Sequence, residues 1–170
     1  MNGRVMLGRA GAAAAAMAMA GGGPVFRRLN TSWDAEPNAP EPRIERRGND
    51  VVLTVVPNRF IHDVPENCAA WRLRFAGATH YRMVPVNDEG WWGGQCRFSE
   101  LAPEYGAFYE IGGDTLDALE PEPWAETGNG EGDGAGLRHF LWYLRDETFE
   151  CKARDWRLEP VVVQADMGER

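Results

Sequence analysis

One stretch, residues 137–156, constrains the fold more than any other part of this chain. It holds two short runs of strand-like alternation that meet at residues 145–147, Arg-Asp-Glu, a polar group typical of a tight turn. The first run is apolar on both faces, with Leu141 and Tyr143 on one and Trp142 on the other, as in a strand covered from both sides. The stretch therefore predicts a β-hairpin inside a sheet.

Similar patterns predict hairpins elsewhere. Residues 43–47 and 51–56 flank a Gly-Asn-Asp group that suits a tight turn, and the second run, VVLTVV, is dense in β-branched residues. Residues 71–76 and 80–86 predict a further hairpin around Gly77, because the first run alternates apolar residues with arginine. Additional strands are expected at 95–101, 105–111 and 156–163.

Hairpins with few helices predict a mainly β protein. We expect about seven to nine strands in an antiparallel sandwich or a partly open barrel, because an apolar sheet face has to be covered. One short helix is expected near 114–120, where Asp114 offers an N-cap and Pro121 ends the helix. If that helix closes one end of the sheets, the fold class becomes α+β.

The two ends of the chain lack strand patterning and limit the predicted domain. Arg4 and Arg9 precede an alanine-rich run with an Ala-Met-Ala triplet, as in a signal peptide. A disordered leader is the other interpretation, because alanine contributes little hydrophobicity. We expect a leader at 1–28, a single β-rich domain at 29–163 and a polar tail at 164–170. The glycine-rich acidic segment 125–136 is expected to be a mobile surface loop.

Three cysteines bear on the cellular compartment. Cys68, Cys96 and Cys151 are an odd number and form no CxxC pair, so no disulfide framework is expected. A cytoplasmic location suits such thiols, and export is the alternative if residues 1–20 are a true signal peptide. Cys151 lies on an apolar strand face and is predicted to be a small core residue.

The charge balance narrows the class of partner. The chain has 18 Lys and Arg residues against 26 Asp and Glu residues, a formal charge of −8. This charge repels both a phosphate backbone and an anionic bilayer. We therefore expect neither nucleic acid nor a membrane as a partner, and a protein partner of basic character is favoured.

Two blocks of the chain resemble motifs of a family of small uncharacterised bacterial proteins. Residues 85–90, PVNDEG, match a P-x-N-D-E turn. Residues 139–151 approximate a terminal strand pair of the form H-x-x-x-x-F/Y-x-D-x-T-F-E-C. The resemblance covers roughly residues 51–156. The family brings no known activity, so the resemblance only directs attention to these positions.

A set of carboxylates and imidazoles is the weak candidate for catalysis. If these side chains converge, they suit acid–base chemistry or metal binding. Their spacing contains neither HExxH nor HxH, so no metal and no cofactor is expected. The candidates are His80, Asp88, Glu89, His139 and Glu150.

Four of these candidates, Asp88, Glu89, His139 and Glu150, also have a structural interpretation. Residues 87–90, Asn-Asp-Glu-Gly, are typical of a hairpin loop, because Asn and Asp bond to their own backbone. His139 on an apolar strand face is typical of a buried histidine that is bonded to a backbone carbonyl. Glu150 is expected either to face water or to meet an arginine across the sheet, with Arg72 and Arg74 as the candidates.

Trp91 and Trp92 are the stronger candidates for recognition. Paired tryptophans beside flexible glycines are typical of binding hot spots, although they could also fold back and plug an open barrel end. Together with Asp88 and Glu89 they form the predicted partner-binding set.

The sequence therefore favours a binding protein over an enzyme. It contains no nucleophile elbow, phosphate loop or dinucleotide-binding fingerprint. We expect a small acidic β-rich protein that engages a protein partner, in the manner of an immunity protein that neutralises a basic toxin. The alternative is a small-ligand-binding protein or an enzyme with a His/Asp/Glu pocket.

Overall fold

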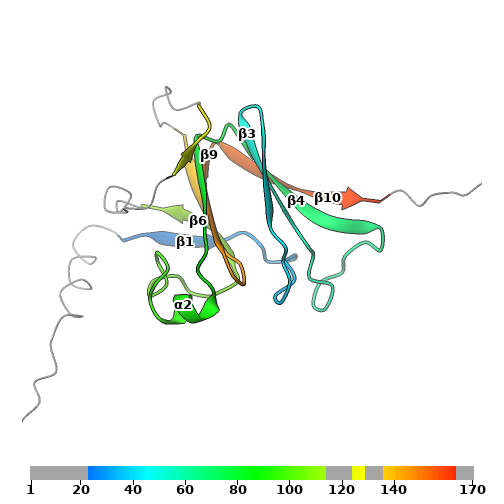
Figure 1. Ribbon diagram of the computed structural model, residues 1–170, viewed down its shortest axis with the longest axis horizontal. Helices are drawn as coiled ribbons and strands as arrows, with labels where there is room; N and C mark the ends of the chain where they lie inside the picture. The colour runs from blue at the N-terminus through cyan, green and yellow to red at the C-terminus, as the bar shows by residue number, and fades with distance from the viewer. Residues whose placement is uncertain (1–22, 114–123, 129–135, 164–170) are drawn as a thin grey trace, which may run out of the picture.

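The computed structural model describes residues 23–113, 124–128 and 136–163. It is 47% strand and 4% helical, and its strands form two antiparallel sheets, of six and four strands (Figure 1). The described strands do not close into a barrel. The prediction of a mainly β antiparallel fold is confirmed, and the two separate sheets form the sandwich alternative.

The larger sheet carries the predicted central hairpin. Its strands, in spatial order, are β1 (Val25–Arg28), β6 (Phe108–Gly112), β8 (Arg138–Tyr143), β9 (Thr148–Ala153), β5 (His80–Val84) and β7 (Ala125–Glu126). The β8–β9 hairpin is confirmed and lies in the middle of this sheet. Both faces of β8 are buried, since Trp142 packs between the sheets and Leu141 packs on the opposite face. Two apolar faces on one strand had predicted this position.

The smaller sheet contains the second predicted hairpin. Its order is β10 (Asp155–Val162), β4 (Cys68–Ala76), β3 (Asp50–Val55) and β2 (Arg43–Arg47). The β2–β3 turn passes through Gly48, whose φ of 62° suits glycine. Pro160 is tolerated in β10 because that strand is at the edge of the sheet, where a missing N–H breaks no ladder.

The predicted hairpin around Gly77 is wrong, because β4 and β5 belong to different sheets. The chain changes partners there: the Ala78 N–H donates to the Asn49 carbonyl, and the Thr79 N–H donates to the Lys152 carbonyl. Phe75 and Met83 therefore approach the same core from opposite sheets. A crossover of this kind lets two apolar strand faces cover each other.

The segment 95–101 is not the predicted strand either. Its backbone closes turns on itself, since the N–H groups of Ser99 and Leu101 donate to the carbonyls of Cys96 and Phe98. Phe98 has a φ of 62°, which is incompatible with an extended strand. The segment instead covers the outer face of the larger sheet.

The start of the sheet and the segment 125–136 differ from the prediction. Strand β1 pairs with β6 and begins before residue 29, so the sheet extends into the predicted leader. The predicted loop 125–136 opens with β7, and Thr127 is buried. Residues 1–22, the helix expected near 114–120 and the tail 164–170 lie outside the described residues. No helix in the described ranges is long and apolar enough to cross a bilayer.

The larger sheet has a core on each of its faces. Between the sheets, the core is rich in aromatic rings. Phe75 and Phe149, for example, pack with their ring centroids 5.2 Å apart. On the outer face, Trp91 and Phe98 pack over Leu141 and Tyr143. Polar side chains on this outer face are therefore covered by protein, which decides the environment of Glu150.

Candidate functional site

The predicted loop at residues 87–90 contains a short helix, α2 (Asp88–Trp92), which Figure 1 shows beside the larger sheet. Asn87 caps it: its side-chain oxygen accepts a hydrogen bond from the Gly90 N–H at 2.9 Å. The Trp91 N–H donates to the Asn87 carbonyl, also at 2.9 Å. The hairpin-loop interpretation is thus wrong, because Asn at an N-cap followed by acidic residues starts a helix equally well.

The two tryptophans of α2 have different environments. Trp91 is only 6% exposed and packs on Tyr105 and Tyr143, with ring centroids 5.5 Å and 5.9 Å away. Trp92 is 76% exposed and stands edge-on to Trp91, with the centroids 4.6 Å apart. Trp91 therefore anchors the helix in the outer core, and Trp92 is presented to solvent on that anchor.

Four carboxylates lie in α2 or in the segments next to it. Asp88 and Glu89 are exposed in the first turn of α2, and the Glu100 carboxylate lies beside Gly94 just after the helix. Glu147, at the tip of the β8–β9 hairpin, lies near Tyr105, the ring that packs on Trp91. None of these four carboxylates forms a salt bridge with any residue that the structure describes. We call this group, Asp88, Glu89, Trp92, Glu100 and Glu147, the acidic tryptophan surface.

The negative charge of these carboxylates also affects the pKa values of Tyr105 and Glu147. Burial raises the pKa of Tyr105, and the charges of Asp88, Asp146 and Glu147 raise it further. Burial and the nearby Asp146 carboxylate likewise raise the pKa of Glu147. The hairpin tip and α2 therefore contribute to one negative region.

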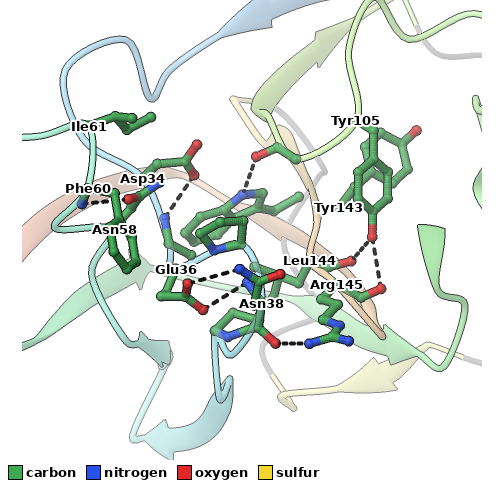
Figure 2. A pocket seen from close by; sticks show the side chains of 15 residues that line it. Asp34, Glu36, Asn38, Asn58, Phe60, Ile61, Tyr105, Tyr143, Leu144 and Arg145 are labelled. Atoms are coloured by element: carbon green, nitrogen blue, oxygen red, sulfur yellow. Dashed lines mark hydrogen bonds between the residues drawn. The ribbon is translucent and has the colours of Figure 1, made fainter.

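Tyr105 also forms part of a cavity of about 580 Å³ (Figure 2). The cavity lies between the segment 34–40, the loop 58–61 and the end of β8. Its lining combines apolar and aromatic side chains with the carboxylates of Asp34 and Glu36. None of the sequence candidates lies in this lining.

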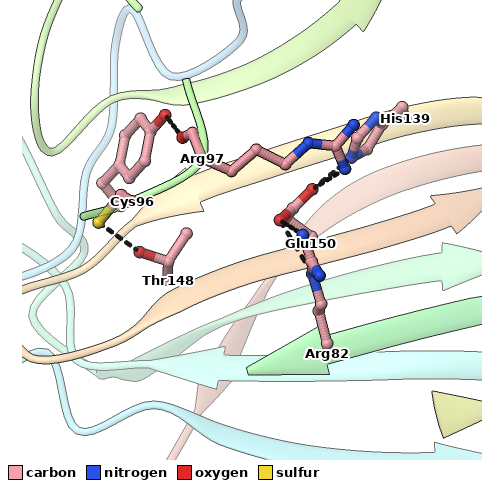
Figure 3. Close-up of polar contacts among 7 residues, drawn as sticks. Arg82, Cys96, Arg97, His139, Thr148 and Glu150 are labelled. Atoms are coloured by element: carbon pink, nitrogen blue, oxygen red, sulfur yellow. Dashed lines mark hydrogen bonds and ion pairs between the residues drawn. The ribbon is translucent and has the colours of Figure 1, made fainter. Parts of the chain in front are cut away.

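The outer face of the larger sheet holds a buried ionic cluster around Glu150 (Figure 3). His139 Nε2 lies 2.7 Å from Glu150 Oε2, and Arg97 Nη1 lies 3.4 Å from the same oxygen. Arg82, which is directly opposite Glu150 in the β5–β9 register, donates to Oε1 from Nε at 3.0 Å and from Nη2 at 2.5 Å. Both oxygens of the carboxylate thus face cations or a histidine ring.

Glu150 is held as a carboxylate by these partners. Burial by itself raises the pKa of Glu150, but the hydrogen bond and charge of His139 and the charges of Arg82 and Arg97 outweigh it. The pKa is lowered as a result. The expectation that Glu150 meets an arginine is correct, but its partners are Arg82 and Arg97 and not Arg72 or Arg74. Those two arginines lie in the smaller sheet.

Aromatic rings cover the cluster. The Arg82 guanidinium lies 4.4 Å from the centre of the Trp124 ring, and the Trp124 and His139 rings are 5.9 Å apart. Phe98 lies against the Arg97 guanidinium at 4.5 Å. Stacking of guanidinium groups on aromatic rings stabilises charges that have little contact with water. The cluster thereby resembles a structural ion-pair network more than a site open to substrate.

The five polar candidates do not form one pocket. Residues directly opposite each other on paired strands form rows across the sheet. One row holds His80, Lys152 and His139, and the row two residues further along the strands holds Arg82 and Glu150. Val84, Thr148 and Tyr143 form a row at the far end, and Asp88 and Glu89 follow beyond Val84. His139 and Glu150 are therefore in contact, while Asp88 and Glu89 lie at the opposite end of the sheet. In the described parts of the chain, no group of three or more His, Cys, Asp or Glu side chains is arranged to hold a metal ion.

Sequence reasoning missed Arg82, Arg97 and Trp124 as members of the buried cluster. Arg82 alternates with Tyr81 and Met83, a pattern typical of a strand whose charged side chains face water. The signal that was available is the pair of apolar faces on β8, because it implies that Glu150 on the paired strand β9 is covered as well and needs charged partners.

The three cysteines are buried free thiols. Cys151 is fully buried in the core between the sheets, as predicted, and burial raises its pKa. Burial also raises the pKa of Cys96, whose sulfur lies 3.7 Å from Thr148 Oγ1. A raised thiol pKa disfavours the nucleophilic thiolate.

A scan against protein-family models and searches of curated proteins and of solved structures return no match to this chain. The resemblance to a family of small bacterial proteins therefore stays a prediction.

Proposed function

We propose that this protein binds a basic protein partner through the acidic tryptophan surface. The observation that carries the proposal is Trp92, a ring that is 76% exposed in a helix that also carries the exposed carboxylates Asp88 and Glu89, neither of which forms a salt bridge with a described residue. Tryptophan is enriched among the residues that dominate binding energies at protein interfaces. Carboxylates that form no salt bridge with any described residue are available to pair with lysine and arginine side chains of another molecule.

The packing of Trp92 on its neighbours also supports the proposal. Trp91 is buried and contacts the Trp92 ring edge-on, and the N-cap at Asn87 fixes the backbone that carries both. A preorganised aromatic side chain loses less conformational entropy on binding than a free one. The arrangement suits a contact residue at the centre of an interface, with the carboxylates at its rim.

The charge of the chain favours a basic partner. The formal charge is −8, and the carboxylates of the acidic tryptophan surface add a local negative field. Such fields accelerate association with a partner of opposite charge and weaken at high salt. The proposed partner is therefore a small basic protein. Our preferred candidate is a basic toxin that this protein neutralises.

The proposal is tested by capture with the full chain as bait. Wild type, Trp92→Ala and Leu101→Ala are immobilised in parallel, and bound proteins from lysate of the source organism are quantified at low and high salt. Leu101 is the matched control, because it is also an exposed apolar residue, at 48%. We expect one basic protein to be retained by wild type and Leu101→Ala, lost from Trp92→Ala and released by salt.

Charge variants distinguish the contribution of the Trp92 ring to binding from that of the carboxylates of the acidic tryptophan surface. Asp88→Asn combined with Glu89→Gln removes two negative charges from exposed positions, so retention should weaken mainly at low salt. If Trp92→Ala and the charge variant both retain the same protein as strongly as wild type, the proposal is wrong.

The alternative function, a ligand-binding protein or enzyme with a His/Asp/Glu pocket, has less support. Asp88 and Glu89 lie far from His139 along the sheet, and both oxygens of Glu150 already have partners. A small-molecule role is better argued from the cavity beside Asp34.

A further inference from the structure

We infer that the cavity between segment 34–40, loop 58–61 and the end of β8 binds a small organic cation, with the ammonium group on Asp34 and the apolar body against an aromatic wall formed by Phe60 and Tyr105. The cavity measures about 580 Å³, within the usual range for small-molecule sites. It shares no residue with the acidic tryptophan surface, so the inference does not depend on the proposed function.

Asp34 supplies an unused acceptor. Its Oδ1 accepts hydrogen bonds from the Ala35 N–H at 2.8 Å and from Asn30 Nδ2 at 2.9 Å. Within the described residues, no donor reaches its Oδ2. Glu36 differs, because its Oε2 accepts from the backbone N–H groups of Asn38 and Ala39 and its Oε1 lies 3.5 Å from Asn38 Nδ2. Asp34 is therefore the carboxylate that is free to meet a ligand.

The surroundings of Asp34 favour a cationic ligand. Burial raises the pKa of Asp34, although hydrogen bonds from Ala35 and Asn30 and the charges of Arg28 and His62 partly offset the effect. The carboxylate thus lacks part of the stabilisation that it would have in water. An ammonium group placed on Oδ2 would restore it through a charge-assisted hydrogen bond.

The polar hydrogens of Tyr105 and Trp142 already have acceptors within the fold. Tyr105 donates to the carbonyls of Leu144 and Arg145, and Trp142 Nε1 donates to the Gly106 carbonyl at 3.1 Å. The guanidinium of Arg145 donates to the carbonyl of Asn38 (Figure 2). The hydroxyl of Tyr105 and the indole N–H of Trp142 are thus used within the fold. Trp142 is fully buried, so the partly exposed ring of Tyr105 is the one that can contact an apolar or cationic group.

Phe60 completes the wall from the open side. It is 82% exposed, although the Asn58 side chain accepts a hydrogen bond from its backbone N–H at 3.0 Å and orders the loop. A large aromatic ring left in water at the edge of a cavity gains burial when a ligand packs against it. Phe60 therefore also offers a substitution that removes binding area without touching the core.

The test uses three probes that share an indole ring and differ in charge. Tryptamine carries an ammonium group, tryptophol is its neutral alcohol analogue, and indole-3-propionate is an anion. Each is titrated into the full-length protein by isothermal titration calorimetry, and the site is located from amide shifts in NMR spectra. We expect tryptamine to bind at least about tenfold more tightly than tryptophol, because a charge-assisted hydrogen bond exceeds a neutral one by this order. Indole-3-propionate should bind most weakly, and amide shifts should centre on Ala35, Gly106 and Leu144.

Two variants and one control locate the contact. Asp34→Asn keeps an acceptor for Ala35 and Asn30 but removes the charge, so it should abolish the preference for tryptamine over tryptophol. Phe60→Ala should weaken both probes by a similar factor. Asp63→Asn, an exposed carboxylate outside the cavity, should change neither.

The inference is overturned if wild type binds tryptamine and tryptophol equally, or binds none of the three up to millimolar concentration. Should Asp34→Asn fail to fold, the comparison of probes on wild type and on Phe60→Ala decides the question. Tryptamine binding that persists unchanged in both Asp34→Asn and Phe60→Ala also contradicts this site.

Discussion

Arg82 and Glu150 face each other across strands β5 and β9, and both side chains are almost completely buried, at 5% and 1% exposure. Their contact is the centre of the ionic cluster on the covered face of the larger sheet. A buried charge is tolerated only where partners replace the water that it has lost. The cluster therefore makes the sheet sensitive to the loss of any one of its charges.

Removal of the central carboxylate should destabilise the fold strongly. Glu150→Gln leaves Arg82 and Arg97 beside a neutral amide, and breaking a buried pair in this way costs about 3–5 kcal/mol. Urea unfolding followed by circular dichroism measures the change in the free energy of unfolding. Glu159→Gln is the control, because its pair with Arg157 is largely exposed and should contribute less than about 1 kcal/mol. Equal effects of the two substitutions would contradict a buried network.

Acid should destabilise the protein through Glu110 as well as Glu150. The hydrogen bonds from Arg138 and Arg27 lower the pKa of Glu110 from 4.5 to about 2 despite partial burial. A carboxylate with a lowered folded-state pKa stabilises the fold above its unfolded-state pKa, and this stability is lost as the pH falls towards the folded-state value. We expect the free energy of unfolding to fall between about pH 4.5 and about pH 2. Urea titrations of Glu110→Gln across this window should show a flatter pH dependence than wild type.

The two tryptophans of α2 should separate stability from recognition. Trp91→Ala removes a buried ring from the outer core and should cost about 3–5 kcal/mol. Trp92→Ala removes an exposed ring and should change the free energy of unfolding by less than about 0.5 kcal/mol. Urea unfolding of both variants tests this difference. A large destabilisation by Trp92→Ala would mean that its exposed ring is a structural contact.

Gly90 should be required for the packing of α2 against the preceding segment. A Cβ atom added at this position would lie 2.6 Å from Val86 Cγ1, which is too close for both to keep their places. Gly90→Ala should therefore cost about 1–3 kcal/mol by overpacking. The double variant Gly90→Ala/Val86→Ala should recover part of that loss, as measured by thermal unfolding. No recovery in the double variant would show that the clash with Val86 is not the cause.

Most strands and two hairpins were predictable from the sequence. The β2–β3 and β8–β9 hairpins pair segments that are adjacent in the chain, and polar turn residues mark both. The turn around Gly77 looked the same locally but joins two sheets. Its destination depends on which distant strand pairs with β5, namely β9. Local periodicity carries no information about that choice.

The candidate site was predictable only in part. The exposed Trp92 and its acidic neighbours were identified from the sequence, whereas the burial of Trp91 depends on Tyr105 and Tyr143, which are distant in the chain. The cavity beside Asp34 left no mark in the sequence, because three separate segments form it.

The sequence by itself determined the fold class, the central hairpin and the acidic character of this protein, because strand alternation, turn residues and charge are local properties. The tertiary structure decided which faces are covered. Strand alternation distinguishes the two sides of a strand, but the layer that packs on each side comes from elsewhere in the chain. Contacts between distant segments therefore buried Glu150 with Arg82 and Arg97, buried Trp91 while Trp92 stayed exposed, and left a cavity beside Asp34.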